Sequence, residues 1–350
     1  MSPATASLPT APAATPRPSL PRMRALFISD LHLGYKGADI RALNEMLKAC
    51  EPEHLYLVGD VFDGWKLEKR WYWTQDYCDL IDILMSLRRR RVPITLITGN
   101  HDEKLREVIP KLFRPLILCR YGIRIEERCM HRTARGKKLL VIHGDQFDGA
   151  LWRGGSKIAD QVWGWLTERG LIPPPRPGRR WSLRRAINRE NGSLNERHVS
   201  AALRRAIHDG ADGIVFGHSH VPILDRREGR AVANCGAWTV ADGGMHTAIA
   251  ETPEGRLEML HWPSTPRHNG KTAAPCTRDE ARQEGPRSET AEHALPAPVL
   301  SVQDPDSARL IRYVYALWRP MQPGMRNLPR PAASPADAST KAALRPTVAA

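Results

Sequence analysis

Between about residues 23 and 263 the chain alternates short apolar runs with longer amphipathic stretches. Five runs of four or five mostly apolar, often β-branched residues predict strands, at 25–29, 55–58, 94–98, 139–143 and 213–217. Because these runs are continuous rather than alternating, they indicate strands that are buried on both faces.

Helical patterns lie between these runs, at 38–50, 71–90 and 194–209. In the last of them, Leu194, Val199, Leu203 and Ala206 recur close to the helical period of 3.6 residues. This alternation predicts an α/β fold with helices on both faces of sheet. Two later runs, 230–235 and 246–251, are expected to be strands that complete a second sheet.

The composition divides the chain into three zones. Residues 1–22 are rich in Ala, Pro, Ser and Thr, and we expect them to be disordered. Residues 23–263 form the expected folded domain, and 264–350 an expected largely disordered tail, interrupted by a short helix around 308–317. On this basis, removal of 1–22 or of the segment after about 270 is expected to leave catalysis intact.

Each of the five predicted strands is followed by a polar cluster. The clusters are Asp30-Leu31-His32, Gly59-Asp60, Gly99-Asn100-His101-Asp102, His143-Gly144-Asp145 and Gly217-His218-Ser219-His220. One such cluster alone is as well explained by an ordinary turn. Ligands of open α/β sheets bind beyond the carboxyl ends of the strands, so five clusters at five such ends predict one shared site.

The residue types in these clusters suit a pair of divalent metal ions. Carboxylate and imidazole ligands are typical of Mn, Fe, Zn or Co, and no thiolate is needed. Two ions roughly 3.5–4 Å apart can hold both the attacking and the leaving oxygen of a displacement at phosphorus. The sequence therefore predicts hydrolysis of a phosphate ester or pyrophosphate bond.

The charge of the chain favours an anionic partner. The formal net charge is +14, which suits nucleic acid, a phosphorylated small molecule or an acidic membrane surface. The six cysteines form no CxxC pair and are expected to be reduced thiols of a cytoplasmic protein. The first 22 residues lack the apolar core of a signal peptide, and no apolar run reaches the length of a membrane span. We therefore expect a soluble or peripheral protein.

The order DxH, GD, GNHD, H and GHxH resembles the calcineurin-like metallophosphoesterase superfamily, over about residues 24–262. The resemblance implies a four-layer αββα sandwich and attack by a hydroxide that bridges two metal ions, with Mn favoured and Fe, Zn or Co as alternatives. One ion would be held by Asp30, His32, Asp60 and His220, and the other by Asp60, Asn100, His143 and His218.

The resemblance also implies roles beside the metals. His101 would protonate the leaving group or steady the charge of the transition state, and Asp102 would orient its imidazole. Asp63 would support the ligands without being one. Asn234 lies where the superfamily often places a loop facing the substrate.

Five longer segments resemble the UDP-2,3-diacylglucosamine hydrolase branch of the superfamily: ISDLHLG, YLVGDVFDGWKLEKRWYW, TGNHDEKLR, VIHGDQFD and FGHSHVP. That branch cleaves a lipid-linked pyrophosphate in lipid A biosynthesis, at the cytoplasmic face of the inner membrane. The chain departs from it at His101, where the branch usually has an arginine. A phosphodiesterase or phosphomonoesterase acting on another small phosphorylated substrate stays an alternative, as does a nuclease of the same fold. Nucleic acid is the less favoured partner, because the chain has no recognised DNA-reading motif.

An insertion at about 149–193 separates HGD from the last helix of the domain, and it is rich in Arg and Trp. We expect it to form a helical lid. Its apolar face could contact acyl chains or a membrane interface, and Arg184 and Arg185 could contact the diphosphate. The alternative is a cap that only packs on the domain.

Overall fold

The computed structural model describes residues 22–102, 105–106, 117, 120–147, 182–239, 245–265, 300–318 and 330–331, with the backbone alone for 182–194 and 330–331. The N-terminal leader, most of the insertion and most of the C-terminal tail therefore lie outside the described residues. Among these residues, no helix combines the length and the apolar character that crossing a bilayer would require.

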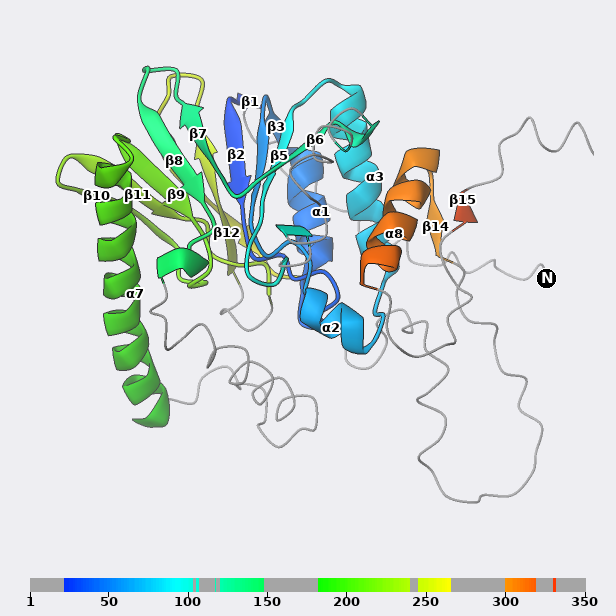
Figure 1. The fold of residues 1–350 in the computed structure, drawn as a ribbon, viewed down its shortest axis with the longest axis horizontal. Coiled ribbons are helices and arrows are strands. Elements are labelled where there is room, and N and C mark those ends of the chain that lie inside the picture. Colours follow the sequence, from blue (N-terminus) through cyan, green and yellow to red (C-terminus); the bar gives the residue numbers. More distant parts are fainter. Residues whose placement is uncertain are drawn as a thin grey trace, which may run out of the picture.

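Two mixed sheets form the centre of the fold (Figure 1). The six-stranded sheet has the order β13-β12-β2-β4-β5-β6, with bounds Leu257–Pro263, Met245–Glu251, Ala25–Ile28, Leu55–Val58, Ile94–Ile97 and Ile123–Glu126. The five-stranded sheet has the order β10-β11-β9-β8-β7, with bounds Ile223–Arg227, Arg230–Asn234, Gly213–Phe216, Lys138–Ile142 and Arg128–Arg132. Strands β2, β4, β5 and β6 are parallel, as are β8, β9 and β11. Parallel strands bring their carboxyl ends to one edge of a sheet, and the polar clusters follow these ends.

Helices cover the outer face of each sheet. Helices α1 (Ile40–Ala49), α3 (Gln75–Arg89) and α8 (Pro305–Leu317) lie on the six-stranded sheet, and α7 (Ser182–His208) lies on the five-stranded sheet (Figure 1). The remaining short elements are β1 (Arg22–Met23), β3 (Glu51–Pro52), α2 (Gly64–Lys69), the 3₁₀ turn η1 (Asp145–Phe147), β14 (Ser301–Val302) and β15 (Arg330–Pro331). These layers confirm the expected αββα sandwich.

The apolar runs are buried on both faces because alternate residues enter different cores. Phe27 of β2 and Val58 of β4 face the second sheet, where they share a core with Val141 of β8 and Val215 of β9. Their neighbours, such as Ile28, face the helices instead. Successive side chains of a strand point to opposite faces, and here both faces are buried. The sequence of these strands therefore shows no alternation of apolar and polar residues.

Helix α8 extends the core beyond the domain limit that the sequence indicates. Asp304 caps its N-terminus by accepting a hydrogen bond from the Asp306 N–H, and Pro305 occupies the first turn. Its buried residues Ile311 and Val314 join the same core as α1 and α3, and Trp318 at its end is fully buried. The short helix expected inside the tail is thus an integral part of the helical layer.

Two expectations about elements need correction. The sequence predicts that the runs 230–235 and 246–251 both join a second sheet, but β12 pairs antiparallel with β2 in the first sheet, and of the two only β11 joins the second. Apolar runs do not reveal which sheet a strand joins, since both sheets bury both faces. Helix α2 has no predicted counterpart, because six residues are too few to display a helical period.

Candidate metal centre

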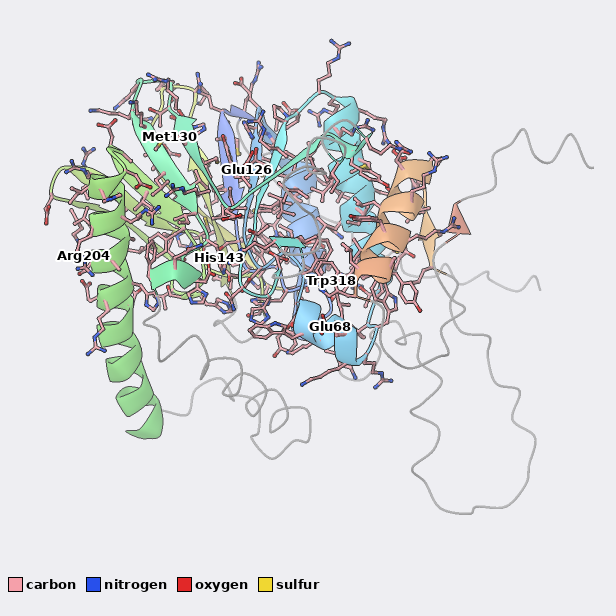
Figure 2. All side chains as sticks on the ribbon, viewed as in Figure 1. Glu68, Glu126, Met130, His143, Arg204 and Trp318 are labelled. Atoms are coloured by element: carbon pink, nitrogen blue, oxygen red, sulfur yellow. The ribbon has the colours of Figure 1, made fainter. Side chains whose placement is uncertain are left out.

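Loops from both sheets meet at one end of the sandwich. Asp30, Asp60 and Asn100 follow β2, β4 and β5 of the six-stranded sheet, and His143 and His218 follow β8 and β9 of the five-stranded sheet. Figure 2 shows His143 at this end, away from Met130. The structure therefore brings the predicted ligand residues to the junction between the two sheets.

The first group of ligand-type atoms comes from Asp30, His32 and His220, whose ligand atoms lie within 4.8 Å of one another. The Nε2 atoms of His32 and His220 are 3.3 Å apart, and His220 Nε2 is 3.2 Å from Asp30 Oδ1. Two imidazole nitrogens and a carboxylate oxygen that point at one another are the donor set of a divalent transition-metal ion.

The second group comes from Asp60, His143 and His218. His143 Nε2 is 3.3 Å from Asp60 Oδ2, while its Nδ1 is 2.9 Å from the Val58 carbonyl oxygen. Since a carbonyl only accepts, Nδ1 carries a proton, and the lone pair of Nε2 is left for the centre in the neutral ring. Asp60 also groups with His32 and His101, so its carboxylate lies between the two sets of ligands.

Three buried atoms of this centre have no neighbour in hydrogen-bond geometry in the part of the chain that the structure describes, although two of them lie 3.2 and 3.3 Å from a polar atom of another ligand. They are Asp30 Oδ1, Asn100 Oδ1 and His143 Nε2. A buried polar atom without a partner costs roughly 1–3 kcal/mol, so three of them in one place indicate a binding partner of the opposite charge. All three are acceptor atoms that a divalent cation would satisfy, and the residues present therefore fit such ions.

The electrostatics of the centre also favour bound cations. Burial lowers the pKa of His143, but the carboxylates of Asp60 and Asp30 outweigh burial and raise that pKa well above its usual range. Burial raises the pKa of Asp30, yet nearby histidines, chiefly His220, lower it to about 2. The pKa of His32 is lowered to about 4, by burial and by neighbouring His101. The carboxylates are therefore ionised and His32 is neutral near pH 7, whereas His143 has to release a proton when it binds a metal ion.

The backbone at the centre is strained. Asp30, His32, Asp60, His218 and His220 all have φ between 50° and 66°, in the left-handed region. Each such residue costs roughly 1–2 kcal/mol for a side chain other than glycine. Backbone hydrogen bonds hold the conformation: the N–H groups of Asp30 and His32 donate to the carbonyls of Gly59 and Asp60. The fold maintains this conformation because it directs the ligand side chains to one point.

Glycines precede several ligands because there is no room for a side chain. A Cβ on Gly99 would lie 2.1 Å from Asp60 Oδ1, and one on Gly217 would lie 2.5 Å from Asp30 Oδ2. Without these side chains the loops approach each other closely, so that the backbone N–H of His101 donates to Asp60 and that of His218 donates to Asp30.

His101 stands beside the ligands, with Nε2 3.9 Å from Asp60 Oδ2. We expected Asp102 to orient its imidazole, and the structure gives this contact to Asp63, whose Oδ1 is 3.3 Å from His101 Nδ1. Trp65 packs against the ring, with the centroids 4.0 Å apart. Trp65 was not anticipated, although the segment DGW directly after GDVF could have drawn attention to it.

Asp102 has a different task from the one expected. Its two oxygens accept hydrogen bonds from the backbone N–H groups of Val61, Phe62 and Gly99. The carboxylate therefore joins the loop after β4 to the loop after β5. Burial and the charge of Asp60 raise the pKa of Asp102 to about 7. The Asp102 side chain points into the protein because three backbone N–H groups of the two loops donate to it there.

Asn234 supports a loop. It is fully buried, and its amide donates to the Gly217 carbonyl at 2.7 Å, while its Oδ1 accepts from the Gly236 N–H. These bonds fix the loop that carries His218 and His220, so the expected contact between Asn234 and substrate is corrected to a supporting role. The side chains of Arg184 and Arg185 lie outside the described residues.

Arg106 is a residue that sequence reasoning missed. Its guanidinium donates to the Thr98 carbonyl at 2.8 Å and to Asp145 Oδ2 at 3.3 Å. It therefore links the loop after β5 to the loop after β8 across the two sheets. Nothing in the spacing of TGNHDEKLR distinguishes it from a solvated surface arginine.

Comparison with known proteins identifies a family whose sequence pattern the chain matches. A family model described as calcineurin-like phosphoesterase matches residues 23–222. UDP-2,3-diacylglucosamine hydrolase of Edwardsiella ictaluri is 28% identical over 270 residues, covering 70% of this chain and 94% of the relative. The protein of the same name from Azotobacter vinelandii is 26% identical over 231 residues, covering 62% of this chain and 91% of the relative.

Solved structures that match the chain include an archaeal phosphodiesterase, with 14% identity, a TM-score of 0.37, and coverage of 68% of this chain and 99% of that one. Vacuolar protein sorting 29 from Cryptosporidium parvum also matches, with 14% identity, a TM-score of 0.34, and coverage of 68% and 97%.

Proposed function

We propose that this chain, which belongs to the calcineurin-like phosphoesterase family, hydrolyses a lipid-linked nucleotide diphosphate. The bond cleaved would be the pyrophosphate bond of UDP-2,3-diacylglucosamine or of a similar compound. The family sets the class of reaction, and the chain is a metal-dependent phosphoester hydrolase. The observation that carries the proposal is the set of three buried acceptor atoms without partners, on Asp30, Asn100 and His143. The relatives named UDP-2,3-diacylglucosamine hydrolase support the choice of substrate.

The centre would hold two divalent cations, and manganese is our proposal for their identity. Asp30, His32 and His220 would hold one, Asn100, His143 and His218 the other, and Asp60 would contact both. When bound, such ions polarise phosphoryl oxygens and make water a nucleophile at neutral pH.

His101 is the residue that we assign to proton transfer. Its Nδ1 faces Asp63, which favours a proton on that nitrogen and stabilises the imidazolium. Its Nε2 then faces the ligand loops, where it can protonate the oxygen of the leaving phosphate. Trp65 packs against the ring and limits its rotation.

The substrate side of the proposal includes a membrane. A diacylated substrate stays in a bilayer through its acyl chains, so the enzyme would act as a peripheral protein at the cytoplasmic face of the inner membrane. The formal net charge of +14 would favour approach to an anionic surface.

A second candidate is a phosphodiesterase for a smaller phosphorylated substrate. The observation that favours it is His101, an imidazole packed between Asp63 and Trp65 at a position where the diacylglucosamine hydrolases usually have an arginine. A histidine can transfer a proton, whereas an arginine acts as a fixed charge.

The test compares hydrolysis of UDP-2,3-diacylglucosamine with that of bis-p-nitrophenyl phosphate by manganese-loaded protein, with Asp60→Ala as the inactive control. Metal-dependent release of UMP that far exceeds cleavage of the generic diester is the expected result. Cleavage of the generic diester without release of UMP would select the second candidate.

A further inference from the structure

The ammonium group of Lys66 lies at the edge of the metal centre. Its Nζ is 3.7 Å from Asp63 Oδ2 and 3.4 Å from the centre of the Tyr35 ring. The same Asp63 carboxylate is 3.3 Å from His101 Nδ1 and 3.9 Å from His32 Nδ1. One carboxylate therefore separates Lys66 from the residue assigned to proton transfer and from a ligand of the first metal ion.

Two neighbouring loops fix the position of Lys66. Helix α2 begins directly after Asp63, whose Oδ1 accepts a hydrogen bond from the Lys66 N–H at 3.2 Å. A Cβ on Gly34 would lie 2.6 Å from Leu67 Cγ, so the loop after β2 approaches α2 as closely as glycine allows. Tyr35 is the next residue of that loop, and its ring contacts the Lys66 ammonium as a cation–π partner.

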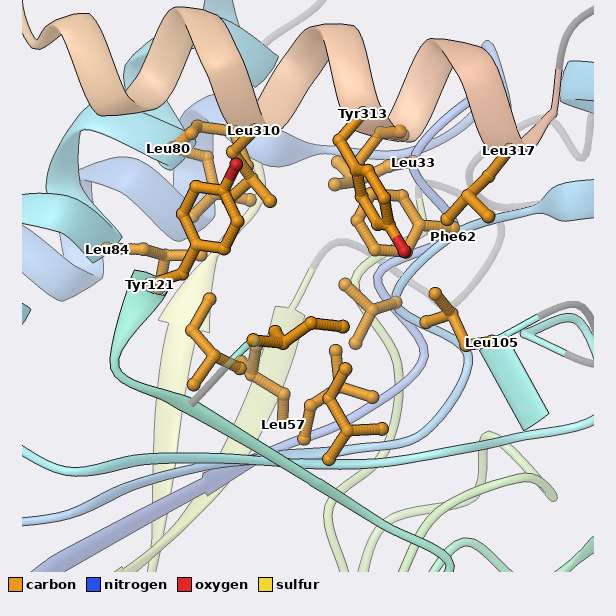
Figure 3. Close-up of a pocket in the computed structure, with 17 residues that line it drawn as sticks. Leu33, Leu57, Phe62, Leu80, Leu84, Leu105, Tyr121, Leu310, Tyr313 and Leu317 are labelled. Atoms are coloured by element: carbon orange, nitrogen blue, oxygen red, sulfur yellow. The ribbon is translucent and has the colours of Figure 1, made fainter. Parts of the chain in front are cut away.

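The apolar layer beneath these loops supports the arrangement. The Asp63 N–H donates to the Leu33 carbonyl at 2.8 Å. Leu33 and Phe62 line the small apolar space beside α8, together with Leu317 (Figure 3). Because buried contacts hold both loops, the lysine is ordered before a ligand binds, and this lowers the entropic cost of binding.

Charge and exposure suit Lys66 to an anionic ligand. Burial raises the pKa of Asp63, but His101, His32 and Lys66 outweigh burial and lower it, so the carboxylate that holds the ammonium is ionised. The Lys66 side chain is 30% exposed, which leaves it accessible to a ligand. Lysine is a common partner of phosphate groups, because its compact charge needs no fixed geometry.

The proposed reaction attacks one phosphorus of a pyrophosphate and releases the other phosphate. The oxygen of water bonds to the attacked phosphorus, and the electron pair of the broken bond goes to the bridging oxygen. His101 gives its proton to that oxygen, which departs with the leaving phosphate. The leaving phosphate therefore lies on the His101 side of the centre, which is the side of Asp63 and Lys66.

We propose that Lys66 binds this leaving phosphate and offsets its negative charge, and that Tyr35 positions the ammonium. This role rests on the proposed function, because a diphosphate substrate has a phosphate as its leaving group. A lysine in this position favours substrates whose leaving group is a phosphate, and an aryl ester gains little from it.

The experiment compares two substrates with different leaving groups in manganese-loaded protein. UDP-2,3-diacylglucosamine releases a phosphate, whereas bis-p-nitrophenyl phosphate releases p-nitrophenol. We expect Lys66→Gln to lower kcat/KM for the diphosphate by about tenfold more than for the diester, as loss of one charge-assisted hydrogen bond predicts. Lys66→Arg keeps the charge and should recover most of this loss. Lys69→Gln is the matched control, because Lys69 is an exposed lysine of the same helix, and it should leave both rates unchanged.

Inhibition by glucose 1-phosphate is a second readout, which does not require the lipid to be a substrate. Its phosphate should occupy the site of the leaving phosphate and inhibit hydrolysis of the diester. Lys66→Gln should raise the inhibition constant by about tenfold. Tyr35→Leu removes the ring and should raise this constant in part, whereas Tyr35→Phe keeps the ring and should match the wild type.

The two readouts separate the role of Lys66 from the proposed function. Wild-type protein that cleaves the diester without releasing UMP would contradict the proposed function, while weaker inhibition in Lys66→Gln would still support the phosphate site. An unchanged inhibition constant in Lys66→Gln would overturn the role of Lys66, as would equal losses on the two substrates. A similar loss in Lys69→Gln would also overturn it, because the effect would then come from surface charge in general.

Discussion

Two of the side chains around the imidazole of His101 favour its role in proton transfer. Asp63 contacts Nδ1, and Trp65 covers the ring face. Asp102, the adjacent residue in sequence, is directed away into three backbone N–H groups. Sequence adjacency suggested the wrong partner, because successive residues of a tight loop face different sides.

His101→Gln should retain the metals and lose turnover by about 10²–10⁴, the range for loss of a general acid. Asp63→Asn should lower turnover less and shift the pH at which His101 loses its proton to a lower value, because the imidazolium loses its carboxylate partner. Metal content and the pH profile of kcat measure the two effects.

Asp76→Asn is the control for Asp63→Asn, since Asp76 pairs with Arg41 at the surface. An unchanged pH profile in Asp63→Asn would remove Asp63 from the orientation of His101. Full turnover in His101→Gln would remove His101 from the reaction.

His54 provides a residue-scale prediction outside the metal centre. Burial and the positive neighbours His131 and Arg124 lower its pKa to about 4, compared with 6.5 in an unfolded chain. The unfolded chain therefore takes up a proton that the folded protein does not, and stability is lost as the pH falls from about 6.5 towards 4. Between pH 7 and pH 5 these two pKa values correspond to about 2 kcal/mol, and solvent screening of the half-buried ring reduces the expected contribution to about 1 kcal/mol. Urea unfolding of His54→Gln should show a loss between these pH values that is smaller by this amount, and equal losses in both proteins would contradict the assignment.

At the scale of elements, the strands were the part most readily predicted. Their apolar runs are distinct, and the position of each polar cluster at a strand end follows from the α/β pattern. The left-handed φ of Asp30, His32 and Asp60 could not be predicted, because it is enforced by contacts between loops that lie far apart in sequence. The supporting contacts of Asn234 and Arg106 could not be predicted either, because they too join loops through tertiary contacts.

Helix α8 carries the clearest prediction about an element. From sequence alone, a truncation after about residue 270 is expected to leave catalysis intact, whereas the packing of α8 predicts the opposite. Trp318 is fully buried, and the centre of its ring lies 5.0 Å from the centre of the Phe62 ring. Its indole nitrogen occupies the space that a side chain at Gly64 would need. Trp318→Ala should therefore cost about 3–5 kcal/mol of stability.

A chain that ends at residue 299 should melt at a much lower temperature and lose turnover, because the loop carrying Asp60 and Asp63 loses its support. A chain that ends at residue 331 retains α8 and serves as the control. Thermal melting and turnover of the generic diester measure both, and wild-type values for the shorter chain would contradict the role of α8.

At the scale of the whole molecule, the metal centre joins two sheets that pack through an apolar interface. Ligands from β2, β4 and β5 belong to one sheet, and those from β8 and β9 to the other. Metal ions at this junction would therefore bind the folded state alone and stabilise it by mass action.

Chelation should lower the melting temperature, and restored manganese should raise it in proportion to the logarithm of its concentration. At 100 times the Kd the gain is about 2.7 kcal/mol. Asp60→Asn should show a much smaller shift, because neither group of ligands keeps the shared carboxylate. A melting temperature that does not respond to chelator would contradict a metal centre that spans both sheets.

The position of α8 in the chain also has a consequence for biosynthesis. One core contains both Met23, near the beginning of the chain, and Trp318, near its end. Translation proceeds at about 5–20 residues per second, so the ribosome needs several seconds to progress from residue 265 to residue 318. During that interval the apolar surfaces of α3 and of the Phe62 loop have emerged while their covering helix has not. The nascent protein must therefore wait, with part of its core open, for a helix that is translated well after the rest of this core.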